Sequence, residues 1–259
     1  MNVIVLAGDR GPDDPLARQA GVTGKTLVPV AGLAMLTRVL QTLGAWQRLD
    51  RAVVVAPDKP EYLSAISAAG IGAATLLAPE ASPSQSVAAA LKKLGPQRPV
   101  TLVTADHPLL RIEWLEQLDA AAEDQDDLRV GLVDHAGVRS RFPDSRRTRY
   151  RFSDRELGGT NLFQFRTVNA DRILTLWRQV ESERKRPWKI VSLLGAANLL
   201  RYAAGRLHSK QAFAALSQRL GVRVGYRLID DPLSAVDVDT PADLALVEAL
   251  FKSDQVACG

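Results

Sequence analysis

An aspartate stands directly after an apolar run in the middle of the chain, in the segment Thr104-Ala105-Asp106-His107-Pro108. A carboxylate at a strand end can hold Mg²⁺, because magnesium prefers one or two carboxylates together with phosphate oxygens and water. The alternative is that Asp106 caps the following turn. A zinc site at His107 is disfavoured, since the chain has only three histidines and no partner at metal-ligand spacing. Asp106 is therefore the first candidate metal ligand.

A second acidic pair lies near the end of the chain, in Asp237-Val238-Asp239-Thr240-Pro241. The run 235–238 reads as a strand, and residues two apart on a strand point to the same side. Both acids could then face one site. Asp239 has a simpler alternative role, support of the helix that starts at Thr240. We therefore predict Asp106 and Asp237 as the two metal ligands.

The segment Leu6-Ala7-Gly8-Asp9-Arg10-Gly11 follows the first apolar run and leads to Lys25. A glycine at a strand end lets backbone N–H groups approach a phosphate, and a lysine that reaches back adds a point charge. The alternative is a flexible strand-to-helix turn. Neither the GxxxxGK[ST] loop nor the GxGxxG fingerprint is present.

Serines open a helix after the third apolar run, in Ser82-Pro83-Ser84-Gln85-Ser86-Val87. Serine at a helix start usually caps the helix. The functional alternative is that Ser84 and Ser86 contact a base or a ribose.

Basic residues gather in two places. Seven arginines fall between Arg139 and Arg155, and a second cluster comprises Arg184, Lys185, Arg186 and Lys189. Such surfaces attract nucleic acid, acidic lipid or phosphorylated small molecules, or are simply solvated. The formal net charge of +4 is weak support for nucleic acid, and we expect no nucleic-acid partner.

Apolar runs of strand length alternate with helical patterns along the first half of the chain. The expected strands are 3–7, 52–56, 73–77 and 100–103, then 128–133, 159–165, 222–228 and 235–238. Residues 9–24 read as a long polar loop, and 188–220 read as helical. This alternation predicts an α/β fold, a mostly parallel sheet with helices on both faces. Ligands bind such sheets at the carboxyl ends of the strands, so the loop after the first strand and Asp106 should share one crevice.

The 259 residues fit a single α/β domain, 1–259. No apolar run approaches the roughly 18–20 residues that span a bilayer, and the N-terminus reads as a buried strand rather than a signal peptide. The lone cysteine, Cys258, fits a reducing compartment. We therefore expect a cytoplasmic protein.

Five segments in order resemble the MobA-like branch of the nucleotidyltransferases of the GT-A-like, Rossmann-like fold. They are LAGDRG, KTLVPVAG, SPSQSV, TADHPLL and DVDTPADL. The branch includes enzymes of molybdenum-cofactor cytidylation, methylerythritol-phosphate cytidylation and sugar-1-phosphate nucleotidylation.

The resemblance implies roles for particular residues. Leu6, Ala7, Gly8, Arg10 and Lys25 would bind the triphosphate; Lys25, Arg10 and Asp106 would act in catalysis. Ser84 and Ser86 would lie near the base, and Asp106 and Asp237 would hold Mg²⁺. The acceptor loop would be Gly158-Gly159-Thr160-Asn161, so that Gly159, Thr160 and Asn161 bind the acceptor.

The chain departs from the family pattern in two places. The loop after the first strand is longer and has Asp9 in place of a glycine, which leaves open whether Arg10 or Arg18 grips the pyrophosphate. The second departure is extra material around 139–156 and 184–220. We place acceptor recognition there, with Arg147 among the residues that pair with an anionic acceptor. Trp188 among basic residues also suggests peripheral membrane contact; the alternative is a core tryptophan.

The implied reaction is magnesium-dependent transfer of a nucleoside monophosphate from a nucleoside triphosphate (NTP) to a small phosphorylated acceptor, with release of pyrophosphate. It needs positioning and charge stabilisation rather than a protein nucleophile. CTP is favoured by the resemblance alone. The alternatives are a glycosyltransferase that uses a nucleotide-sugar, against which stands the single acid in TADHP, and a non-catalytic nucleotide-binding regulator.

Overall fold

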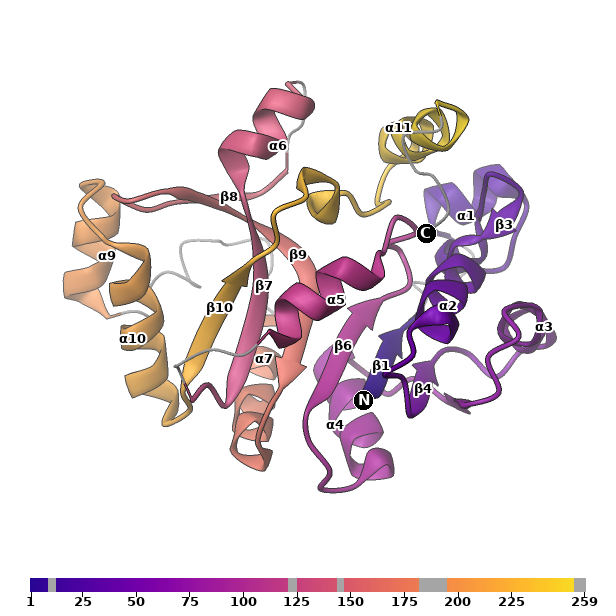
Figure 1. Cartoon of the computed structure of the whole chain (residues 1–259), viewed down its shortest axis with the longest axis horizontal. Helices are drawn as coiled ribbons and strands as arrows, with labels where there is room; N and C mark the ends of the chain where they lie inside the picture. Colours follow the sequence, from indigo (N-terminus) through magenta and orange to yellow (C-terminus); the bar gives the residue numbers. More distant parts are fainter. Residues whose placement is uncertain (9–12, 121–124, 144–146, 182–194, 254–259) are drawn as a thin grey trace.

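The computed structural model describes residues 1–8, 13–120, 125–143, 147–181 and 195–253 (Figure 1). An eight-stranded sheet forms its centre, in the order β10-β7-β9-β6-β1-β4-β5, with β8 paired to β9. The strands are β1 (Asn2–Leu6), β4 (Arg51–Val55), β5 (Ala74–Leu77), β6 (Val100–Thr104), β7 (Leu128–Asp134), β8 (Arg149–Arg151), β9 (Glu156–Phe165) and β10 (Val224–Leu228). A separate small ribbon pairs β2 (Pro29–Val30) with β3 (Leu33–Ala34).

The sheet is mostly parallel, as the sequence predicts. Strands β5, β4, β1 and β6 run parallel to one another, and β10 runs parallel to β7. Only β9 interrupts this pattern in the described sheet, since it is antiparallel to β6, β7 and β8. The carboxyl ends of β1, β6 and β7 therefore lie at the same edge as the beginning of β9.

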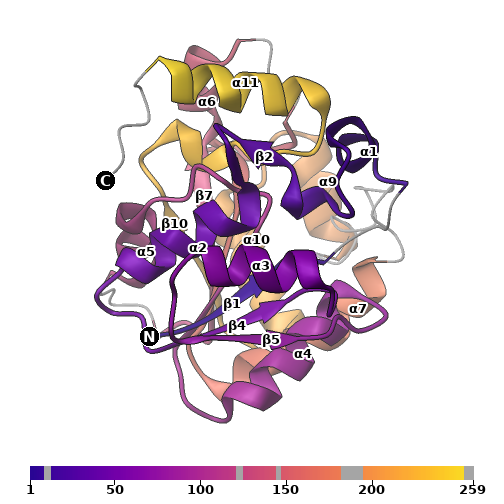
Figure 2. The ribbon, with the colours of Figure 1, turned by 90° about the vertical axis from the view of Figure 1, so that its right-hand side faces the viewer.

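Helices cover both faces of the sheet (Figures 1 and 2). The α-helices are α1 (Pro15–Ala20), α2 (Met35–Ala45), α3 (Pro60–Ala68), α4 (Pro83–Leu94), α5 (Ile112–Asp119), α6 (His135–Arg141), α7 (Ile173–Glu181), α9 (Ala196–Ala203), α10 (Ser209–Leu220) and α11 (Pro241–Lys252). Three short 3₁₀ helices are η1 (Lys25–Leu27), η2 (Val168–Arg172) and η3 (Pro232–Ala235).

Alternation along the strands divides the core into two layers. Val3 and Val5 of β1 pack into the layer beneath α2, α3 and α5, whereas Ile4 packs into the layer beneath α4 and α7. Successive side chains of a strand point to opposite faces, so each buried strand contributes to both layers. The two layers hold the sheet rigid, and its carboxyl edge is then a fixed platform for polar side chains.

Several expected elements are wrong. The loop 9–24 contains α1, because the Asp14 side chain accepts hydrogen bonds from Leu16 N (3.0 Å) and Ala17 N (3.3 Å) and caps the helix. Gly21 then ends it with a φ of 66°. The helix is one and a half turns long, too short to show an apolar period.

The later part of the chain also differs from expectation. Residues 235–238 form no strand; η3 ends at Ala235 and irregular backbone follows. The arginine-rich stretch contains α6 and β8. The described part of 188–220 is mostly helical, as expected, and forms α9 and α10. Trp188 and its basic neighbours lie outside the described residues. No helix in the described ranges is long and apolar enough to cross a membrane.

Candidate active site

Lys25 lies between two carboxylates at the carboxyl edge of the sheet. Its Nζ donates a hydrogen bond to Asp106 Oδ2 at 2.8 Å and a second one to Asp239 Oδ1. The Lys25 side chain is only 9% exposed. The three charged groups come from η1, from the end of β6 and from the segment before α11, so the fold joins positions more than 80 residues apart.

The charges in this cluster stabilise one another. Burial by itself would lower the pKa of Lys25, but the charge of Asp106 and the hydrogen bonds to both carboxylates outweigh it and hold that pKa above its ordinary value. Burial would likewise raise the pKa of Asp106, and the Lys25 ammonium outweighs it and lowers that pKa. Lys25 is therefore charged and Asp106 is ionised at neutral pH.

The backbone fixes the two carboxylates relative to each other. Asp106 lies two residues after the end of β6, and its carbonyl oxygen accepts a hydrogen bond from Val238 N at 2.8 Å. Thr240 then caps α11 through a hydrogen bond from Asp243 N, with Pro241 in the first turn. Asp239 therefore lies between Val238, whose backbone is bonded to Asp106, and the capped start of α11.

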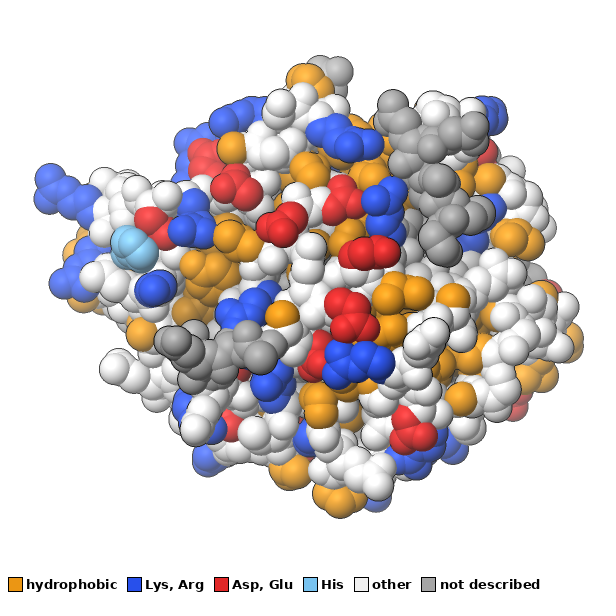
Figure 3. Space-filling view, in the orientation of Figure 1, with side chains coloured by type: hydrophobic (Ala, Val, Ile, Leu, Met, Phe, Trp, Pro, Cys, Tyr) orange, Lys and Arg blue, Asp and Glu red, His pale blue; other side chains and the backbone are white. Residues whose placement is uncertain are grey.

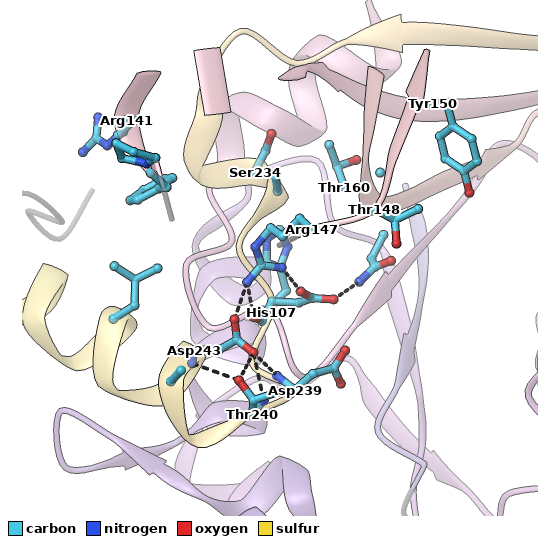
Figure 4. A pocket seen from close by; sticks show the side chains of 18 residues that line it. His107, Arg141, Arg147, Thr148, Tyr150, Thr160, Ser234, Asp239, Thr240 and Asp243 are labelled. Carbon is cyan, nitrogen blue, oxygen red and sulfur yellow. Dashed lines mark hydrogen bonds and ion pairs between the residues drawn. The ribbon is translucent and has the colours of Figure 1, made fainter. Parts of the chain in front are cut away.

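A second ionic cluster surrounds Arg147 (Figure 4). Its guanidinium donates to Asp237 Oδ1, to the Asp237 carbonyl oxygen at 2.7 Å and to Asp243 Oδ1 at 2.9 Å. Asn161 Nδ2 donates to the other Asp237 oxygen, Oδ2, at 2.8 Å. Both carboxylate oxygens of Asp237 therefore have partners.

A bulge in β9 turns Asn161 toward this cluster. The register between β7 and β9 shifts between Val130 and Leu132, and Asn161 has a φ of 56°. Thr160 Oγ1 donates to the Gly131 carbonyl oxygen at 2.8 Å. A Cβ at Gly131 would lie 2.6 Å from Thr160 Oγ1, so glycine is required there for the bulge to pack.

A cavity of about 1000 Å³ opens beside Arg147. Three of the sequence candidates for acceptor binding, Gly159, Thr160 and Asn161, line it together with Arg147 itself. Asp237 and Asp239 also line it. In the view of Figure 3, acidic side chains gather near the middle of the molecule with basic ones among them. The predicted acceptor residues thus share one cavity next to the Lys25 cluster.

His107 forms part of the cavity floor and is 1% exposed. Its ring lies against Trp114 with 5.3 Å between centroids. Burial, the largest influence, lowers the pKa of His107, so the ring is neutral at pH 7. No three His, Cys, Asp or Glu side chains gather into a metal site within the described ranges.

The residues present fit a magnesium ion that shares its coordination with phosphate. Asp106 Oδ1 is buried and forms no hydrogen bond of normal geometry with any described residue, although the Thr104 hydroxyl helps to lower the Asp106 pKa. Asp239 is the other carboxylate on Lys25. The role of Asp237 as a metal ligand stays a prediction. Both of its carboxylate oxygens already accept hydrogen bonds, so Asp237 would first have to lose its contacts with Arg147 and Asn161.

The other phosphate-binding candidates begin with the last residue of β1 and continue after it. Leu6 ends the strand, and its carbonyl oxygen accepts from Ala105 N at 2.9 Å. Ala7 N donates to the Val55 carbonyl at 2.9 Å, and Gly8 is exposed with open space around its Cα. Arg10 lies outside the described residues. The Arg18 side chain is 69% exposed and pairs with Asp13 at 3.6 Å.

The serines at the start of α4 have local partners. Ser86 Oγ accepts from Glu80 N at 2.9 Å, and the Ser84 and Ser82 hydroxyls lie 3.1 Å apart. Ser84 and Ser86 are 2% and 3% exposed. Their contact with a base stays a prediction.

Most described arginines of the 139–155 stretch have acidic partners. Arg139, Arg149 and Arg151 surround Glu156 at 3.4, 3.7 and 3.4 Å. Of the arginines in this stretch that the structure describes, Arg141 and Arg147 line the cavity. The stretch is therefore a structural ion network from which two arginines reach the candidate acceptor site.

Two functional candidates are not assigned by the sequence. Its pattern allows Asp239 to face the site but favours helix support for it, and it gives Asp243 no role in the site. The two carboxylate oxygens of Asp243 have different donors. Oδ2 accepts a hydrogen bond from Thr240 N at 2.9 Å, and Oδ1 accepts one from Arg147. The motif Thr-Pro-x-Asp signals the cap, but no local pattern signals the arginine.

Comparison with known proteins agrees with this geometry. Among curated relatives, the bifunctional protein GlmU of Burkholderia multivorans is 32% identical over 124 residues, which cover 48% of this chain and 26% of GlmU. The chain therefore matches only about a quarter of that relative's length.

Solved structures share the fold along nearly the whole chain. A hypothetical transferase from Thermus thermophilus matches with a TM-score of 0.77 and 29% identity, covering 94% of this chain and 100% of the other. CMP:2-keto-3-deoxy-manno-octonic acid synthetase, solved with CTP, matches with a TM-score of 0.60 and 15% identity over 98% of both chains. The last likeness shows the fold alone.

The sequence profile of the MobA-like NTP transferase domain matches residues 3–232. This range contains Lys25, Asp106 and the β9 bulge, and the resemblance seen in the short motifs is confirmed. The chain belongs to the MobA-like NTP transferase family.

Proposed function

We propose that this protein transfers a nucleoside monophosphate from an NTP to a small phosphorylated acceptor and releases pyrophosphate. The observation that carries the proposal is the Lys25 cluster, in which a buried ammonium and two carboxylates meet at the carboxyl edge of the sheet. That edge is where α/β sheets bind ligands. A cavity for a second substrate adjoins it.

The chain's own residues supply positioning and charge. Lys25 would bind the phosphates, with the backbone N–H groups after β1 approaching them. Asp106 and Asp239 would hold Mg²⁺, which when bound neutralises charge on the transferring phosphate. Arg147, fixed by Asp237 and Asp243, would orient the acceptor so that its phosphate oxygen lies in line with the bond to be broken. No protein nucleophile is required.

We extend this proposal to CTP. Two solved proteins of the same fold support that base: the synthetase solved with CTP, and a 2-C-methyl-D-erythritol 4-phosphate cytidylyltransferase from Thermus thermophilus, which matches with a TM-score of 0.51 and 18% identity over 97% of this chain and 98% of the other. Thermal stabilisation by each of the four NTPs with Mg²⁺ measures the preference. Stabilisation by CTP no greater than by the other three would contradict it.

The reaction itself is tested by pyrophosphate release. Purified protein with CTP, Mg²⁺ and a panel of small phosphorylated acceptors should release pyrophosphate only when an acceptor is present. Binding of NTP without release, across a panel that includes sugar phosphates and polyol phosphates, would favour a regulator over an enzyme. Release of nucleoside diphosphate from a nucleotide-sugar would favour a glycosyltransferase.

Asp106→Asn tests the metal assignment. The substitution keeps the size of the side chain but removes the charge that faces Lys25, so we expect a folded protein with a lowered melting temperature and a fall in kcat/KM of at least about 100-fold. Steady-state pyrophosphate release measures it. Turnover near the wild-type rate that still requires Mg²⁺ would remove Asp106 from the metal site.

A further inference from the structure

We propose that Lys25 is an internal counter-ion, which occupies the cation position between Asp106 and Asp239 in the free protein and leaves it when an NTP binds. The inference rests on the proposed function, because it takes these carboxylates as the site that serves the NTP. It adds an order to binding: the site binds a divalent cation alone only weakly, because the cation must displace Lys25, and it opens when the nucleotide arrives.

The contacts show that the ammonium is a fixed part of the site. A lysine ammonium has three N–H donors, and two of them reach Asp106 Oδ2 and Asp239 Oδ1. With its side chain 9% exposed, Lys25 is shielded from water on most sides. A solvated surface lysine would not be held in this way.

The same oxygens are those that a divalent cation would need. Magnesium and manganese prefer carboxylate oxygens, and the two nearest carboxylates are already in contact with a positive charge. Like charges at contact distance repel strongly in a partly buried site. A cation without nucleotide must therefore displace Lys25, which then loses both acceptors while its stem is still buried.

A polyphosphate changes this balance. Its oxygens offer the ammonium new acceptors, and the lysine stem has four methylene groups that allow the ammonium to move without backbone change. Asp239 is the open side of the cluster, since its side chain is 52% exposed and that of Asp106 is 22% exposed. Lys25 can thus move toward a nucleotide on the solvent side and free both carboxylates.

Manganese binding without nucleotide tests the proposal directly. Lys25→Met removes the charge and keeps most of the buried stem, and Lys59→Met, at an exposed position before α3, is the matched control. We expect Lys25→Met to bind Mn²⁺ at least about tenfold more tightly than wild type, measured from the free-ion EPR signal, and Lys59→Met to bind like wild type. Equal or weaker binding by Lys25→Met would overturn the proposal.

A measurement on the wild-type protein covers the case in which Lys25→Met does not fold. An amine-reactive reagent, with mass spectrometry of the peptide that contains Lys25, reports how exposed the amine is. Labelling of Lys25 should be slow in the free protein and should rise as added Mn²⁺ fills the site. Asp106→Asn is the control, because it should abolish Mn²⁺ binding at this site. If Mn²⁺ saturates the site in the wild-type protein and Lys25 stays as protected from labelling as before, the proposal is overturned.

The failure of this inference is separable from the failure of the proposed function. Unchanged Mn²⁺ affinity in Lys25→Met, together with CTP-dependent pyrophosphate release by wild type, would reject the counter-ion and leave the enzyme. Tighter Mn²⁺ binding in Lys25→Met, with no pyrophosphate release by wild type, would keep the counter-ion and reject the reaction.

Discussion

Lys25 shows how one residue gains its properties from its surroundings. Its ammonium is buried, yet its pKa is raised, because the charge of Asp106 and two hydrogen bonds outweigh the cost of burial. A lysine that is already charged before the substrate arrives needs no protonation step before it can bind phosphate. The same residue can therefore serve first the carboxylates and then the phosphates.

Lys25→Ala should weaken NTP binding about tenfold or more and lower turnover with it, because a point charge on the phosphates is lost. Lys59→Ala should bind like wild type. Isothermal titration calorimetry with CTP and Mg²⁺ measures both. Equal CTP affinity in Lys25→Ala and wild type would remove Lys25 from the phosphate site, whatever its effect on Mn²⁺ alone.

At the scale of elements, buried polar side chains hold the second half of the sheet together. Arg129 of β7 is fully buried and bonds to Asp126 at 3.1 Å and to the Leu118 carbonyl at the end of α5. Next to it, Asp127 accepts from Thr167 Oγ1 at 2.7 Å and from Arg223 N at 2.8 Å. These contacts join β7, η2 and β10, and so fix the platform from which β9 carries its bulge.

Asp127 should make stability depend on pH. Burial alone would raise the pKa of Asp127, but hydrogen bonds from Arg223, Thr167 and Asn169 outweigh it and hold that pKa well below its ordinary value. The Asp127 carboxylate therefore binds a proton more readily in the unfolded chain than in the folded one. Its contribution to the free energy of unfolding is fully present above about pH 4 and is lost as the pH falls further, toward the folded-state pKa.

Asp127→Asn should therefore lower the free energy of unfolding by about 2 kcal/mol at pH 7, and the difference from wild type should shrink below about pH 4. Urea unfolding across pH 2.5–7 measures both curves, the pH values being chosen around the ordinary carboxyl value of about 4. Asp58→Asn, at an exposed position, is the control. A wild-type to Asp127→Asn gap that is constant over this range would contradict the assignment.

At the scale of the whole molecule, the two halves of the chain each supply part of one site. The first half brings Lys25 and Asp106, and the second half brings Asp239, Arg147 and Asn161. The contact of Val238 N with the Asp106 carbonyl oxygen joins the halves, and Ala31 N donates to Glu248 Oε1 of α11 at 2.8 Å. The residues proposed to bind the nucleotide and those proposed to bind the acceptor therefore lie far apart in sequence and close together in space.

Arg147→Gln should accordingly affect one substrate and spare the other. We expect the acceptor KM to rise several-fold while the affinity for CTP stays unchanged, because Arg147 lines the cavity beside the Lys25 cluster. Arg151→Gln is the matched control, since Arg151 is 60% exposed and pairs with Glu156 outside the cavity. Steady-state kinetics with each substrate varied in turn measures both. Unaltered acceptor kinetics in Arg147→Gln would leave Arg147 with a structural role only.

The sequence by itself determined the alternation of strands and helices, and with it the α/β fold and the edge where Asp106 stands. Apolar periodicity carries this information because each buried strand and helix must match its own period. Tertiary structure alone decided the partners of the charged residues. Residues 235–238 form no strand, so Asp237 and Asp239 need not point to the same side as residues two apart on a strand do. Asp237 bonds to Arg147, and Asp239 bonds to Lys25. Ion pairs depend on distances between segments far apart in the chain, which no local pattern records.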